Sequence, residues 1–114
     1  MKPFVLPALA GAMLTMFAAA SLAAAPDDAQ LETGKTLFLT GAVPACAVCH
    51  TLQDAQATGT IGPDLDELKP DAARVKKIMV EGAGAMPSFA ATLDDAAMDA
   101  ISAYVAHATG ADAK

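Results

Sequence analysis

Cys46, Cys49 and His50 are the residues of this sequence whose types and spacing could do chemistry. The two cysteines are the only ones in the chain and stand three positions apart, and one of the two histidines follows directly. Three chemistries use such a set: a redox dithiol, part of a zinc site, or covalent attachment of haem with the histidine as an iron ligand. The short motif alone does not choose among them.

The surroundings of the motif favour haem. A thioredoxin-like dithiol is expected in a βαβ setting, whereas helical and glycine-rich segments flank this one. A zinc site would have to combine Cys46, Cys49, His50 and His107, and adjacent Cys49 and His50 do not match the usual paired spacings of zinc ligands. With haem, each thiol forms a thioether with one vinyl group, and His50 supplies the proximal imidazole.

A haem iron used for electron transfer needs a sixth ligand, and Met86 is the strongest candidate in the sequence. Gly82 and Gly84 precede it and allow the chain to approach a flat ring closely, while Pro87 favours an extended backbone at Met86. The remaining candidates fall in predicted helices, where core packing or a helix end explains them; they are Met79, Met98 and His107.

A first helix is predicted over residues 27–39, with Gly34 and Phe38 on one face. A glycine in the middle of a helix indicates that another backbone comes close. Residues 40–69 show no sustained periodicity and contain several glycines and prolines, which predicts a loop. A loop of this length is uncommon in a compact domain unless it wraps something.

Two further helices are predicted near the end of the chain. Asp71 can cap the first of them and Gly82 can end it, while Asp94 can cap the last helix and Gly110 can end that one. No strand-like alternation or repeat is found, so we expect an all-α domain with three main helices and long loops. The basic residues predicted to face water on the first of these two helices are Arg74, Lys76 and Lys77.

The N-terminal segment has the layout of a secretory signal peptide. A lysine at position 2 is followed by an uncharged apolar run over 4–20, and small residues follow. Ser21 and Ala23 suit a signal peptidase, so the sequence predicts a signal peptide over 1–23, with cleavage after residue 23 or 24, and a single domain over 24–114. An uncleaved membrane anchor is the alternative, and the residues that interrupt the apolar run are Pro3, Pro7 and Gly11.

Composition limits the partners and the core. The formal net charge is −6, and loss of Lys2 with the signal makes it −7, which argues against nucleic acid or an anionic membrane as partner. A domain of about 90 residues is marginal without an added staple. The domain has only three aromatic residues, so haem would also supply its missing core; they are Phe38, Phe89 and Tyr104.

The chain resembles class I c-type cytochromes in four features that occur in the same order: the Gly34/Phe38 helix, Cys46-Ala47-Val48-Cys49-His50, Ile61-Gly62-Pro63-x-Leu65 and Met86-Pro87, followed by the Tyr104 helix. The resemblance implies a class I cytochrome c fold wrapped around one covalent haem c, with Cys46 and Cys49 attaching it. It also implies that His50 and Met86 bind the iron, that the Pro63 carbonyl meets His50, and that the first and last helices cross near Gly34 and Tyr104.

The phrases "PACAVCHTLQDA", "GTIGPDLDELKP" and "EGAGAMPSF" are similar to the small monohaem subunit or electron acceptor of bacterial sulfite dehydrogenases. This implies a periplasmic electron carrier, not an enzyme by itself. It would accept electrons from a molybdenum-dependent sulfite dehydrogenase and pass them to a downstream cytochrome or terminal oxidase of the respiratory chain. The alternatives are another periplasmic dehydrogenase as donor, a haem peroxidase or gas sensor with a labile Met86, and a haem-free thiol oxidoreductase. We expect docking at an apolar rim made of Ala45, Ala47, Val48 and Pro87.

Overall fold

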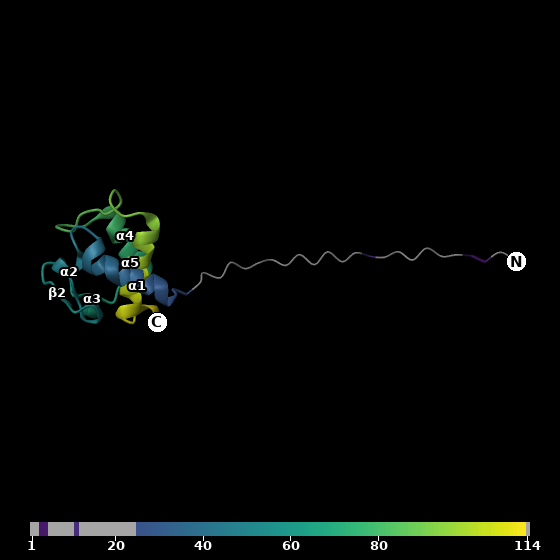
Figure 1. The fold of residues 1–114 in the computed structure, drawn as a ribbon, viewed down its shortest axis with the longest axis horizontal. Coiled ribbons are helices and arrows are strands. Elements are labelled where there is room, and N and C mark those ends of the chain that lie inside the picture. The colour runs from purple at the N-terminus through teal and green to yellow at the C-terminus, as the bar shows by residue number, and fades with distance from the viewer. Residues whose placement is uncertain (1–2, 5–10, 12–24, 114) are drawn as a thin grey trace.

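The computed structural model describes residues 3–4, 11 and 25–113, and the predicted signal peptide falls almost entirely outside them. Residues 25–113 fold into a mostly helical unit (Figure 1). Its elements in chain order are α1 Asp28–Thr36, the π-helical turn η1 Leu37–Gly41, α2 Cys46–Cys49, β1 Thr51–Leu52, the 3-10 turn η2 Gln53–Ala55, β2 Ala57–Thr58, α3 Leu65–Leu68, α4 Ala72–Glu81, α5 Asp95–Ala108 and the 3-10 turn η3 Ala111–Ala113.

The three longest α-helices each begin after an aspartate cap, and two of these caps, Asp71 and Asp94, are the predicted ones. The carboxylate of Asp27 accepts a hydrogen bond from the Gln30 backbone N–H at the start of α1. Asp71 and Asp94 do the same for α4 and α5. Each of these side chains satisfies a backbone N–H that has no partner inside the helix, which fixes where the helix starts.

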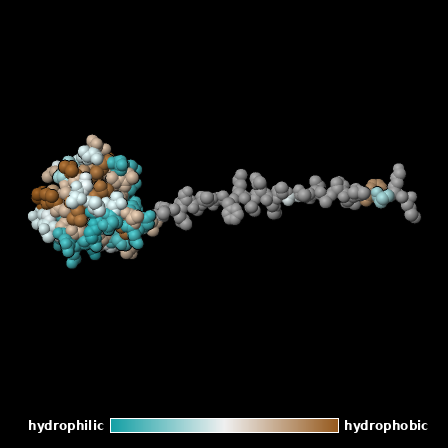
Figure 2. Space-filling view, in the orientation of Figure 1, coloured by the Kyte–Doolittle hydropathy of each residue, from teal (hydrophilic) through white to brown (hydrophobic). Residues whose placement is uncertain are grey.

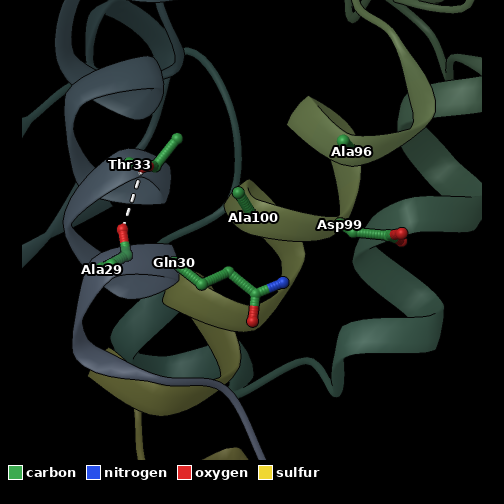
Figure 3. Close-up of a pocket in the computed structure, with 6 residues that line it drawn as sticks. All are labelled: Ala29, Gln30, Thr33, Ala96, Asp99 and Ala100. Carbon is green, nitrogen blue, oxygen red and sulfur yellow. Dashed lines mark hydrogen bonds between the residues drawn. The ribbon is translucent and has the colours of Figure 1, made fainter.

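Helices α1 and α5 cross in close contact, as Figures 1 and 3 show. A Cβ added at Gly34 would lie 2.6 Å from the Cβ of Tyr104 and 2.7 Å from the carbonyl carbon of Ala100. The ring of Phe38, one turn further along the chain, meets the ring of Tyr104 edge-on at 6.0 Å between centroids. The predicted crossing near Gly34 and Tyr104 is therefore confirmed.

The small side chains at this crossing leave only a shallow depression on the surface. Figure 3 shows Ala29 and Thr33 on α1 facing Ala96 and Ala100 on α5, with the Thr33 hydroxyl bonded back to the Ala29 carbonyl at 2.9 Å. None of the polar side chains that line this depression is buried. The depression is the outer edge of a helix crossing.

The prediction of one structureless loop over residues 40–69 is wrong in detail. This segment contains α2, α3 and a two-stranded antiparallel hairpin in which Thr51 pairs with Thr58 and Leu52 with Ala57. Each strand has two residues, too few to show alternation in a sequence. The first helix also differs from the prediction, because the α-helical part ends at Thr36 and a π-helical turn completes it.

The basic face predicted for α4 is only partly correct. Lys77 is exposed, but Lys76 reaches across to α5 and pairs with Asp95 at 2.8 Å and with Asp99 at 2.7 Å. These two ion pairs join α4 to the first turns of α5. Arg74 is exposed, yet it also lines the cavity described below. Among the described residues, no helix is long and apolar enough to cross a membrane.

Candidate functional site

A cavity of about 600 Å³ collects the four residues predicted to form the site. Cys46, Cys49, His50 and Met86 all line it, together with apolar side chains from α4, α5 and the segment before α4. Arg74 is the only Lys, Arg, Asp or Glu residue among the lining residues. The cavity thus has a mostly apolar wall with two thiols, an imidazole, two thioethers and one guanidinium.

The two cysteines lie on a single helical turn, α2. Because Cys46 and Cys49 are three residues apart on this turn, they lie on the same side of it. The backbone N–H of His50 donates to the Cys46 carbonyl at 2.9 Å, after which the chain becomes extended. This change of direction places the imidazole directly after the two thiols, against the same cavity.

A hydrogen bond fixes the orientation of the His50 ring. Its Nδ1–H donates to the carbonyl oxygen of Pro63 at 2.7 Å, which confirms the contact implied by the resemblance. With the proton on Nδ1, the lone pair of Nε2 is available to bind a metal. A carbonyl acceptor of this kind also raises the basicity of a ligating imidazole.

Two glycines bring the segment that carries Pro63 against the motif. A Cβ at Gly62 would lie 2.6 Å from Cε1 of His50, and its own N–H donates to the Cys49 carbonyl at 2.7 Å. A Cβ at Gly59 would lie 2.6 Å from the Val48 carbonyl oxygen. The loop therefore packs directly on the backbone of the motif, where a side chain would not fit.

Met86 lies on the loop that follows α4. The loop turns away from the helix at Gly82, whose φ of +72° is a conformation that side-chain-bearing residues rarely adopt. Ala83 and Met86 then exchange both backbone hydrogen bonds, at 3.0 and 2.9 Å. Met79 also lines the cavity, but it lies on α4 and is only 2% exposed.

The competing interpretations of the motif lose ground in the structure. Burial, and to a smaller extent the neighbouring Cys49, raises the pKa of the Cys46 thiol to about 11, whereas redox-active dithiols depend on a lowered pKa. His107 is exposed and bonds to Asp112 at 2.9 Å. Within the described part of the chain, no group of three or more His, Cys, Asp or Glu side chains is arranged to hold a metal ion.

Sequence reasoning missed two features around the site. Arg74 was placed on the water face of α4, and nothing in its spacing indicated a cavity residue. The second feature is a tie between three elements: the Tyr104 hydroxyl on α5 donates to Asp54 on η2 at 2.6 Å, and Lys35 on α1 pairs with the same carboxylate at 3.5 Å. This tie holds the hairpin that follows His50 onto the helix crossing.

Comparisons with known proteins agree with this geometry. The family model described as "Cytochrome C oxidase, cbb3-type, subunit III" matches residues 29–105. Among solved structures, the c-type cytochrome SorU from Sinorhizobium meliloti is 44% identical, with a TM-score of 0.71, over 74% of this chain and 95% of that chain. A search of curated proteins found no match.

The predicted all-α class I cytochrome c fold is thus confirmed, and with it covalent haem c as the cofactor. The cavity fits such a group, since the only two thiols of the chain and a correctly oriented imidazole line the same apolar wall. The family match covers more than half of the chain. The chain therefore belongs to the class I c-type cytochromes, which transfer electrons and are not enzymes by themselves.

Proposed function

We propose that Cys46 and Cys49 would attach one haem c through thioethers, and that His50 and Met86 would bind its iron. The observation that carries this proposal is the convergence of all four side chains on one cavity. When bound, haem c supplies an iron that gains and loses single electrons. The Pro63 carbonyl orients His50, and the soft sulfur of Met86 favours the reduced iron, which raises the reduction potential.

Met79 is the rival to Met86, because both line the cavity. The side chain of Met79 packs in the apolar core, where it is almost fully buried. Met86 is only partly buried and lies on a loop whose glycines allow close approach. A Met86→Leu variant is therefore expected to lose the far-red absorption band of sulfur-to-iron charge transfer, while Met79→Leu keeps it as a matched control.

Arg74 is assigned to the two carboxylates that haem carries at its edge. It is the sole charged residue of the cavity lining, and no salt bridge engages it within the described residues. A guanidinium binds carboxylates through paired hydrogen bonds, and the rest of the lining is mostly apolar. The apolar wall excludes water and so favours the less charged, reduced state.

The proposed docking face is the exposed part of residues 36–63, the segment that carries the two cysteines and His50, and it has almost no charge. Between positions 36 and 63 the only charged residue is Asp54, which is already bonded to Tyr104 and Lys35. Figure 2 shows apolar surface on the side of the unit where α2 lies. The large exposed apolar residues of this segment are Val43, Val48 and Ile61, at 78%, 61% and 70% exposure.

We infer that the protein acts in the periplasm, after removal of residues 1–23, as a carrier of single electrons. The proposed donor is a molybdenum-dependent sulfite dehydrogenase, supported by the sequence phrases quoted above, and the acceptor is a downstream cytochrome or terminal oxidase. Brief encounters between electron carriers bury less than ~1,200 Å², and the exposed side chains of Val43, Val48 and Ile61 suit a contact of that kind. Because this face is nearly uncharged, any dependence of the association on ionic strength should come from the net negative charge of the rest of the domain.

The test is stopped-flow reduction of the mature holoprotein by sulfite dehydrogenase and sulfite. Rapid haem reduction that requires both enzyme and sulfite would support the proposed donor. Val48→Glu should slow this reduction, whereas Ala113→Glu, on exposed η3 outside the cavity lining, serves as the matched control. If dehydrogenase and sulfite leave the haem oxidised while a chemical reductant reduces it, the electron donor is a different one.

A further inference from the structure

The loop that carries Met86 returns to the helix from which it leaves. After Gly82 ends α4, the chain makes the tight Ala83–Met86 turn and then runs back along the last turn of that helix. The Phe89 backbone N–H donates to the Met79 carbonyl at 2.7 Å. Met86 is therefore held between two points of attachment to α4, one on each side.

Ser88 supplies a side-chain bond at the second point of attachment. Its hydroxyl donates to the Val80 carbonyl at 2.6 Å and accepts a hydrogen bond from the Ala90 N–H at 3.3 Å. Within residues 25–113, it is the only side chain that bonds the loop between α4 and α5 to α4. Val80 lies in the last turn of α4, where backbone carbonyls have no partner inside the helix. The Ser88 hydroxyl supplies a hydrogen-bond donor to one of these carbonyls.

The bond lies close in the chain to the proposed iron ligand. Ser88 follows Met86 by two residues, and rigid Pro87 stands between them, so a shift of Ser88 is passed on to the backbone of Met86. Gly82 packs against the same residues, since a Cβ there would lie 2.9 Å from the Ser88 nitrogen and 3.0 Å from the Met86 oxygen. The three residues thus pack as one unit.

We infer that Ser88 is a positioning residue for Met86, whose hydroxyl sets the fraction of molecules in which the methionine sulfur has left the iron. This inference rests on the proposed ligand set. A neutral intramolecular hydrogen bond of this kind is worth about twofold to tenfold in an equilibrium constant. Loss of the hydroxyl should therefore raise the open fraction by about the same factor.

Carbon monoxide is the probe, because it binds reduced haem iron only where the sixth position is open. The rate of carbon monoxide binding to the reduced holoprotein reports the open fraction. Ser88→Ala should bind it about twofold to tenfold faster than the wild type. Ser88→Thr keeps the hydroxyl and should restore the wild-type rate within about twofold.

The control is Thr33→Ala, which also removes a hydroxyl bonded to a helix carbonyl, at 2.9 Å, but on α1. It should leave the rate unchanged. If Ser88→Ala binds carbon monoxide no faster than wild type, or if Thr33→Ala accelerates binding equally, the inference is overturned. Failure of the proposed ligand set would look different, since the wild type would then lack the far-red band or Met86→Leu would keep it.

Discussion

Replacing Gly34 with alanine tests the closest approach in the fold. The new Cβ would lie 2.6 Å from the Cβ of Tyr104 and 2.7 Å from the carbonyl carbon of Ala100, and closer still to the carbonyl oxygen of Ala100. Ordinary van der Waals contacts begin at 3.4 Å, so α1 would have to move away from α5 by at least about 0.8 Å. The obstacle is largely backbone, which cannot change rotamer to make room.

The expected magnitude follows from two opposing effects. Inserting a methyl group into a packed interface costs about 1–3 kcal/mol, and the upper half of that range applies because backbone must move. Alanine returns about 1 kcal/mol through its better helix propensity. The net loss in the free energy of unfolding is therefore about 1–2 kcal/mol, which corresponds to a fall in Tm of about 5–15 °C for a domain of this size.

The assay is thermal unfolding of the holoprotein followed by far-UV circular dichroism, with Gly41→Ala as matched control. At Gly41 the nearest atom to an added Cβ is the end of the Leu37 side chain, at 2.5 Å, and this side chain can adopt another rotamer. Gly41→Ala should therefore melt within a few degrees of the wild type. If Gly34→Ala melts as high as Gly41→Ala, the helices do not cross as closely as described.

Three further predictions concern the site and its supports. Gly62→Ala should push the His50 ring away from Pro63, because the new Cβ would lie 2.6 Å from Cε1 of His50. A redox titration should then show a lower reduction potential than that of the wild type. Tyr104→Phe should lower the free energy of unfolding by about 1 kcal/mol at pH 8, measured with urea, because its bond to half-exposed Asp54 is lost. Burial, and after it the bond to Asp54, raises the pKa of Tyr104 in the folded protein. The folded protein therefore keeps a proton that the unfolded chain loses above about pH 10. Above that pH the wild type should lose stability, and its advantage over Tyr104→Phe should shrink. Lys76→Gln should lower the Tm at low salt, and the difference should diminish toward 1 M salt, where the screening length falls to about 3 Å; a constant difference would contradict a role for charge.

Local chemistry explains what the sequence could predict. Asp71 and Asp94 cap their helices as predicted, because capping depends on the few residues that follow the cap. The convergence of the cysteines, His50 and Met86 on one cavity was expected from the motif and the family resemblance together. Their roles as ligands remain a prediction that the proposed variants test.

Long-range contacts explain what the sequence could not predict. Asp54 stands in a segment without periodicity, and only the folded chain brings it to Tyr104, fifty positions later. Arg74 shares a helix with Lys76 and Lys77, for which the sequence predicts the same water-facing position, and its place in the cavity depends on how α4 packs. The bond from Ser88 to Val80 depends on how the loop returns to α4. Each of these features depends on tertiary structure, for which residue spacing gives no signal.

The wall of the cavity is also the core of the protein. Phe38, Ile101 and Val105 are 1%, 2% and 2% exposed, and all three line the cavity as well as the packed centre. Ile101 and Val105 lie on α5 and Phe38 lies on η1, the turn that follows α1, so the crossing of α1 and α5 at Gly34 holds this part of the cavity wall together. A displacement of either helix would therefore change the packing of the domain and the surroundings of the iron together. In a domain of about 90 residues with only three aromatic side chains, the same few contacts must both stabilise the fold and help to set the reduction potential of the site.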